Sequence, residues 1–220
     1  MDERDTYDLR LKWPFRMIVA GSSGCGKTTL LTRLIARAYD VMTIQPKEII
    51  IFYHHMQEAY KNIQRTARCP VKLLNGTENL TDSFETSPGT LVVIDDMQAS
   101  HAAIVSAWFT RKSHHLDSSI VYLVQNVFDK SVHHRTISLN STYIVLFKNP
   151  RDGTQISHLD RQVFPGGGGL LSAAYRDITQ NAPHSYVVAD FNQDTPDAIR
   201  LRSTLFPHDD FPRAFTYVLQ

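Results

Sequence analysis

Short apolar runs recur along the 220-residue chain, and polar or amphipathic stretches separate them. Such runs are typical of strands buried on both faces of a sheet, whereas apolar residues three and four positions apart predict helices. The pattern predicts strands at residues 15–20, 48–53, 91–94, 119–124 and 143–147, short strands or extended segments at 71–74 and 186–189, and helices from residue 28 onward and at 57–65, 100–110 and 170–179. This alternation predicts an α/β fold with a mostly parallel central sheet flanked by helices.

The remaining segments define how the chain is organised. Residues 1–14 are expected to form an extended lead-in, and residues 75–90 a polar loop with Asn-Gly and Ser-Pro-Gly turns. No repeat or linker divides the sequence. Residues 1–220 are therefore expected to form a single domain, with a core at about 15–152 and a less regular extension at 153–220.

Four consecutive glycines, Gly166 to Gly169, lie inside this extension. Glycine-rich loops can cradle phosphate, but no Lys-Ser or Lys-Thr pair follows these glycines and no clear strand precedes them. We therefore expect a flexible loop or hinge here.

Composition and charge limit the classes of protein to which the chain can belong. Apolar residues make up 42% and charged residues 20% of the chain, which is typical of a globular protein. The net charge is +1, so binding to nucleic acid would depend on a local patch or on many subunits acting together. The charged N-terminus does not resemble a signal peptide, and no apolar run approaches the roughly 18 residues of a membrane helix. Cys25 and Cys69 form neither a metal-ligand pattern nor a disulfide framework, so a soluble intracellular protein is expected.

Residues 21–29 read GSSGCGKTT and match the phosphate-loop (Walker A) pattern G-x-x-x-x-G-K-[ST] between a predicted strand and a predicted helix. Glycine allows the tight turn that points backbone N–H groups at phosphate oxygens, and the positive end of the helix adds to the attraction. Lys27 is expected to reach the β- and γ-phosphates of ATP, and the Thr28 hydroxyl to bind Mg²⁺. The nucleotide-binding residues predicted in this loop are Gly21, Ser22, Ser23, Gly24, Cys25, Gly26, Lys27, Thr28 and Thr29.

An acidic pair, Asp95 and Asp96, follows the apolar run LVVI in the manner of a Walker B motif. In open α/β sheets, ligands bind at the edge where the carboxyl ends of the strands meet. Asp95 is therefore expected to hold Mg²⁺ through its water shell, and Asp96 to orient or deprotonate the attacking water. A second acid at this position favours hydrolysis over transfer to a bound acceptor.

Two amides, Gln125 and Asn126, follow the predicted strand at 119–124. A neutral amide there can contact the γ-phosphate or the attacking water, which makes Gln125 a candidate sensor of hydrolysis. The alternative is an amide that caps the next segment. Lys27, Asp95 and Gln125 are each expected at the end of a strand, so that one edge of the sheet presents all three.

Two basic clusters flank the same strand, at residues 111–115 (RKSHH) and 133–135 (HHR). Adjacent histidines lack the i, i+4 spacing of a helical zinc site, so we do not expect them to bind metal. The clusters are either solvated loop residues or part of a subunit interface, where an arginine can reach the γ-phosphate of a neighbour. Arg111 is the first candidate for this arginine finger, Arg135 the second and Arg151 the third.

Together these motifs resemble those of the DNA-packaging ATPases of the FtsK/HerA superfamily, especially the small enzymes of poxvirus-like viruses and of Polinton- and adintovirus-like elements. The resemblance covers about residues 15–152 and rests on FRMIVAGSSGCGKTTLLTRLI, LVVIDDMQ, WFTRKSHHLDSSIVYLVQNVF and RTISLNSTYIVLFKNPRD. One departure is Asp96, because many members of the wider superfamily carry glutamate at that position.

This resemblance implies a RecA-like core of the ASCE class, in which the sensor strand lies between the phosphate-loop strand and the acidic strand. It implies that Lys27 and Thr28 bind nucleotide and metal, and that Asp95 binds metal. It also implies Asp96 as the catalytic acid and Gln125 as the sensor. The implied assembly is a homo-oligomeric ring, often of five or six subunits, that threads double-stranded DNA into a capsid at its portal vertex. The corresponding location is the host nucleus or a cytoplasmic virus factory, with association with the virion as a further option.

Other functions share the phosphate loop. A small-molecule or nucleoside kinase would add a pocket for the acceptor of the γ-phosphate, and the Asp-Asp pair together with Gln125 argues against it. A non-catalytic capsid-vertex or DNA-binding scaffold would keep the fold without turnover, and the intact Lys27 and Thr28 argue against that. A GTPase is disfavoured because the chain has no Asn-Lys-x-Asp motif.

Overall fold

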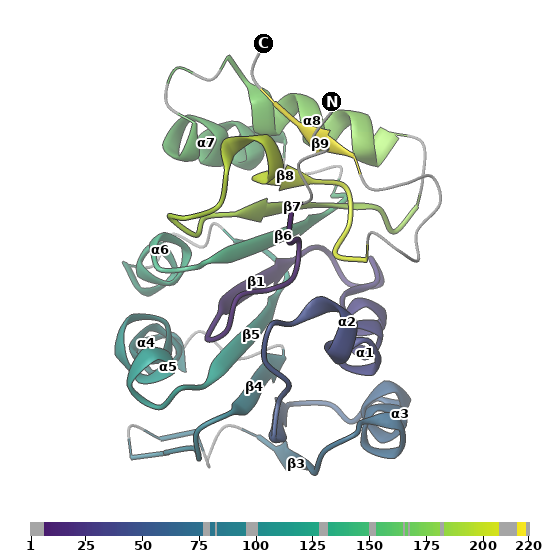
Figure 1. Ribbon diagram of the computed structural model, residues 1–220, viewed down its shortest axis with the longest axis vertical. Helices are drawn as coiled ribbons and strands as arrows, with labels where there is room; N and C mark the ends of the chain where they lie inside the picture. Colours follow the sequence, from purple (N-terminus) through teal and green to yellow (C-terminus); the bar gives the residue numbers. More distant parts are fainter. Residues whose placement is uncertain are drawn as a thin grey trace, which may run out of the picture.

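The computed structural model of the chain describes residues 7–76, 80–81, 83–95, 101–127, 132–149, 153–164, 166, 168–180, 183–206 and 215–218. These residues form a nine-stranded sheet in the order β3-β2-β4-β5-β1-β6-β7-β8-β9, with helices on both faces (Figure 1). Three positions singled out in the sequence, Asp96, Arg151 and Gly167, lie outside the described residues.

Six neighbouring strands of this sheet are parallel and extend from its β3 end to β6. They are β3 (Val71–Asn75), β2 (Glu48–Tyr53), β4 (Thr90–Asp95), β5 (Ser119–Val124), β1 (Arg16–Ala20) and β6 (Tyr143–Phe147). Every residue of β4, β5 and β6 is buried, as expected where helices cover both faces of a parallel sheet. All six strands were predicted from the apolar runs to within one residue at each end.

The order of the central strands confirms the expected position of the sensor strand. Tyr122 of β5 pairs with Ile18 of β1 on one side and with Ile94 of β4 on the other. The carboxyl ends of the phosphate-loop strand and of the acidic strand therefore lie on either side of the end of β5.

The C-terminal part of the chain continues the same sheet in the opposite direction. β7 (Tyr186–Asp190) pairs antiparallel with β6, and β8 (Leu201–Arg202) and β9 (Thr216–Tyr217) follow with antiparallel pairing. The extension is therefore more regular than the sequence indicated. Because β7 runs against β6, its first residues lie at the edge of the sheet where β6 ends.

Helices cover the two faces of the sheet, and Figure 1 shows the two layers. One face carries α1 (Lys27–Ala36), α2 (Ala38–Val41) and α3 (Glu58–Thr66). The other face carries α4 (Ala102–Ala107), α5 (Ser113–His115) and α6 (Val132–Leu139). At the β7 end, α7 (Gly153–Val163) and α8 (Leu170–Gln180) pack together, and a 3₁₀ turn, η3 (Asp197–Ile199), precedes β8. Each face has its own apolar core, one containing Leu31 and Leu34 and the other Val105 and Trp108.

The predicted helix at 100–110 is present from Ala102, but it does not end at 110. It widens into a π-helical turn, η2 (Trp108–Lys112), and continues as α5. π-helical turns are rare and often occur near functional sites. The helix α6 was not predicted because it buries little apolar surface, with Ile137 as its buried residue.

The glycine-rich turn joins α7 to α8. Gly166, Gly168 and Gly169 have φ angles of +82°, +61° and +88°, which glycine adopts without strain. The buried carboxylate of Asp160 accepts hydrogen bonds from the backbone N–H groups of Leu171 (3.0 Å) and Ser172 (3.3 Å). These bonds fix the start of α8 to α7, so the turn is anchored on both sides.

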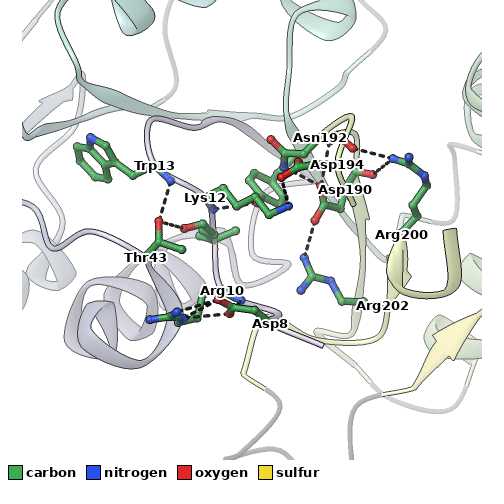
Figure 2. Close-up of polar contacts among 12 residues, drawn as sticks. Asp8, Arg10, Lys12, Trp13, Thr43, Asp190, Asn192, Asp194, Arg200 and Arg202 are labelled. Atoms are coloured by element: carbon green, nitrogen blue, oxygen red, sulfur yellow. Dashed lines mark hydrogen bonds and ion pairs between the residues drawn. The ribbon is translucent and has the colours of Figure 1, made fainter. Parts of the chain in front are cut away.

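The N-terminal segment is tied to the C-terminal strands (Figure 2). The guanidinium of Arg202 donates to the carbonyl of Leu9 (2.6 Å) and pairs with the carboxylate of Asp190 (3.4 Å). Both side chains of this ion pair are almost completely buried. The ammonium of Lys12 pairs with Asp194 (2.8 Å), so residues far apart in sequence form one cluster of charges.

The outermost strands of the sheet differ in length and charge. β9 has two residues. At the opposite end, the exposed Lys72 of β3 pairs with Glu48 of β2 at 2.6 Å, which places a cation on the outer strand.

Candidate active site

The phosphate loop lies between β1 and α1, as the motif requires. Gly24 and Gly26 have φ angles of +76° and +113°, values that favour glycine. The N–H of Gly21 donates to the carbonyl of Val124 at 3.1 Å, so the start of the loop is bonded to the last residue of β5. The loop then turns into α1, whose N-cap is Gly26.

Gly21 is also required by the space around it. A Cβ atom at this position would lie 2.5 Å from the Cys25 sulfur and 2.7 Å from the Cβ of Phe147. Both distances are shorter than van der Waals contact allows. Phe147, the last residue of β6, thus forms part of the surface on which the loop rests. Burial raises the pKa of the Cys25 thiol, which suits a packing role for this side chain.

Lys27 is the first residue of α1 rather than the end of a strand, which corrects one detail of the sequence prediction. Its ammonium donates hydrogen bonds to the carbonyl oxygens of Gly21 (2.6 Å) and Ser22 (3.1 Å). The positive charge is therefore held over the loop.

Asp95 is the last residue of β4 and is only 6% exposed. Its carboxylate accepts a hydrogen bond from the hydroxyl of Tyr60 and another from the side-chain amide of Gln57, the latter at 3.4 Å. Tyr60 lies in α3, and Gln57 is the residue just before the first turn of that helix. Sequence reasoning did not identify either residue, because neither belongs to a motif and only the packing of α3 brings them to β4.

These elements surround a pocket of about 320 Å³. Its lining residues are Ser23, Gly24, Gly26, Lys27, Thr28, Thr29, Gln57, Asp95, Leu123, Val124 and Gln125. The structure thus brings together Lys27, Asp95 and Gln125, as predicted from their places at one edge of the sheet. Thr28 and Asp95 both line the pocket, and a hydroxyl and a carboxylate are oxygen ligands of the kind that Mg²⁺ prefers, so the residues present fit a Mg²⁺–nucleotide complex.

Solved structures share the fold of this chain. The genome packaging NTPase B204 of Sulfolobus turreted icosahedral virus 2 in complex with ATP-gammaS is 12% identical, with a TM-score of 0.52 over 83% of this chain and 95% of that one. Its complex with AMPPCP gives 12% identity and a TM-score of 0.50 over 86% and 96% of the two chains. ATPases 2 and 3 of EssC from Geobacillus thermodenitrificans give 11% identity and a TM-score of 0.53 over 81% of this chain and 38% of that one.

This chain has the fold of a P-loop NTPase. The solved neighbours and the strand order agree on the fold, an α/β sheet that is mostly parallel and flanked by helices. No protein-family model and no curated protein matches the sequence. None of the helices in the described part of the chain combines the length and the apolar character of a bilayer span.

Of the arginine candidates, the two that the structure describes, Arg111 and Arg135, do not line the pocket. Arg111 lies in η2, before β5, and the following turn is near the amino edge of the sheet, where the Gly89 N–H donates to the Asp117 carbonyl. Arg135 lies in α6, which follows β5 and so begins on the side of the phosphate loop.

Lys112, the neighbour of Arg111, is held by the protein itself. Its ammonium donates to the carbonyl of Phe84 at 3.1 Å and lies 5.7 Å from the centre of the Trp108 ring. The basic cluster at 111–115 is therefore not uniformly solvated: Arg111 is exposed and Lys112 is partly buried.

Proposed function

We propose that this chain is an ATPase that works as a ring and drives double-stranded DNA into a viral capsid. The proposal rests on one observation: Lys27, Thr28, Asp95 and Gln125 all line one pocket beside the phosphate loop. A single nucleotide-binding residue can occur by chance, but this combination brings a cation, a hydroxyl, a carboxylate and an amide to one pocket.

Each residue has a specific task in this proposal. The backbone N–H groups of the loop hold the phosphates of ATP, and Lys27 balances the charge on the transferred phosphate. Thr28 and Asp95 would hold Mg²⁺, which neutralises phosphate charge when bound. Gln125 is exposed directly after β5 and lines the pocket, and we assign to it the contact with the γ-phosphate or the attacking water.

Asp96 follows Asp95 directly and is our candidate for orienting and deprotonating that water. Asp96→Asn is therefore expected to bind ATP and to lose turnover, whereas Lys27→Ala is expected to lose hydrolysis because it removes a charge-assisted contact to the phosphate. Both variants are measured by phosphate release and by binding of a fluorescent ATP analogue. If Asp96→Asn keeps wild-type turnover, another residue orients and deprotonates the attacking water.

DNA is the proposed substrate of the motor, in part because the fold is shared with a genome packaging NTPase. A net charge of +1 argues against tight binding by one subunit, and a ring can add the contacts of several subunits. The deciding experiment measures ATP hydrolysis with and without duplex DNA, together with the mass of the assembly in solution. Phosphate transfer to a nucleoside, without stimulation by DNA, would identify a kinase, and nucleotide binding without turnover would identify a scaffold.

A further inference from the structure

His184 brings the C-terminal extension into contact with the phosphate loop. It lies in the turn between α8 and β7, and its Nδ1 is 2.9 Å from the carbonyl oxygen of Cys25. A Cβ atom placed on Gly26 would lie 3.6 Å from the Cβ and from the Nδ1 of His184. The imidazole therefore packs directly beside the Cys25–Gly26 peptide. Because a carbonyl oxygen only accepts hydrogen bonds, Nδ1 carries the proton in this contact.

The backbone of His184 is in a conformation that side chains usually avoid. Its φ is +63°, in the left-handed region where a non-glycine residue is uncommon. Backbone strain of this kind persists where the surrounding contacts hold it, and it is found at binding sites more often than elsewhere. Here the strained turn points the side chain at the loop.

The contact with Cys25 has a consequence for the neighbouring amide. A trans peptide is planar, with its C=O and its N–H pointing in opposite directions. A hydrogen bond that holds the Cys25 carbonyl toward His184 therefore turns the Gly26 N–H away from His184. Gly24 and Gly26 flank Cys25, and glycine restricts its backbone less than other residues do, so a contact that holds the Cys25–Gly26 peptide reduces the orientations open to it.

We propose that His184 is a positioning residue of the nucleotide site: it fixes the Cys25–Gly26 peptide so that the Gly26 amide is directed at bound phosphate. The proposal rests on the proposed nucleotide binding and adds a role for the C-terminal extension, which the motifs do not include. A loop that is already oriented loses less conformational entropy on binding, so the contact increases affinity for the phosphate chain.

Two substitutions separate this role from a purely structural one. His184→Gly removes the imidazole and adopts φ of +63° without strain, so the turn keeps its shape. His184→Asn also tolerates that backbone, and its side-chain nitrogen is as many bonds from the backbone as Nδ1 of histidine, so it can donate to Cys25. Thermal unfolding of both variants confirms that they are folded.

Calorimetric titration with ADP and with inorganic pyrophosphate provides the readout. In His184→Gly, the Kd for both ligands is expected to rise by about three- to tenfold, the effect of one neutral hydrogen bond, and His184→Asn is expected to restore most of the affinity. Unchanged affinity in His184→Gly would overturn the proposal. So would a loss confined to ADP, which would indicate contact with the base, or an asparagine variant as weak as the glycine variant. A wild-type chain that binds neither ligand would overturn the proposed function itself.

Discussion

The hydroxyl of Tyr60 donates a hydrogen bond to the carboxylate of Asp95, across 35 positions of sequence. Tyr60 is completely buried, so this bond lies in the interior behind the pocket. A buried carboxylate needs such donors because removal from water disfavours its charge. The position of the acid that we assign to Mg²⁺ is thus set from α3, an element outside the nucleotide-binding motifs.

Tyr60→Phe tests this dependence. The substitution keeps the ring and removes the donor, and a hydrogen bond to a charged group contributes about 1.5–3 kcal/mol. We expect a fall of about tenfold or more in turnover and a higher Mg²⁺ concentration at half-maximal rate. Tyr53→Phe is the matched control, because the Tyr53 ring packs on Tyr60 with centroids 5.5 Å apart. Equal Mg²⁺ dependence in all three proteins would show that Asp95 is positioned without Tyr60.

Gly21→Ala tests the fit of the loop against Phe147. The added Cβ would overlap with the Cys25 sulfur at 2.5 Å and with Phe147 at 2.7 Å, so the backbone must move. We expect a loss of about 1–3 kcal/mol in the free energy of unfolding, as for other overpacked sites, together with weaker nucleotide binding. The control is Gly153→Ala, where the added Cβ meets nothing within 4 Å. Tight nucleotide binding by Gly21→Ala would contradict the fixed position of the loop.

Arg202→Ala tests the charge cluster that joins the two ends of the chain. The substitution leaves Asp190 buried without its cation and also removes the bond to the Leu9 carbonyl. Breaking a buried ion pair in this way costs about 3–5 kcal/mol, which denaturant unfolding can measure. Arg10→Ala removes an exposed pair with Asp8 and should change stability little. Similar curves for the two variants would show that the buried pair does not stabilise the fold.

Mixing of subunits tests which arginine acts across an interface. α6 begins at the edge of the sheet where the phosphate loop lies, so we expect Arg135 to be the finger in preference to Arg111, the reverse of the order expected from sequence. Lys27→Ala subunits mixed with Arg135→Ala subunits should recover part of the hydrolysis, and each variant alone should have none. Arg111→Ala alone should retain most of its rate. No recovery in the mixture would indicate a monomeric enzyme or another finger.

The sequence predicts the central sheet well because burial on both faces leaves a continuous apolar run that is easy to recognise. β2, β5 and β6 match their predicted bounds, and the phosphate loop and Asp95 lie where the motifs place them. By contrast, α6 buries too little apolar surface to give a periodic signal. Tyr60 and His184 reach the site through packing, from positions 35 residues before Asp95 and 159 residues after Cys25. Contacts over such separations leave no local pattern in a single sequence.

The two outermost strands of the sheet limit how copies of the chain can associate. A sheet grows by adding strands from another molecule when its outer strand is long, flat and uncharged. Here one outer strand has two residues, and the other presents Lys72. Edge-to-edge pairing is therefore disfavoured on both sides, and we expect subunits of a ring to meet through helices and loops. Contacts between helices and loops can break and form again at each turnover, because no backbone hydrogen bonds of a shared sheet have to be broken.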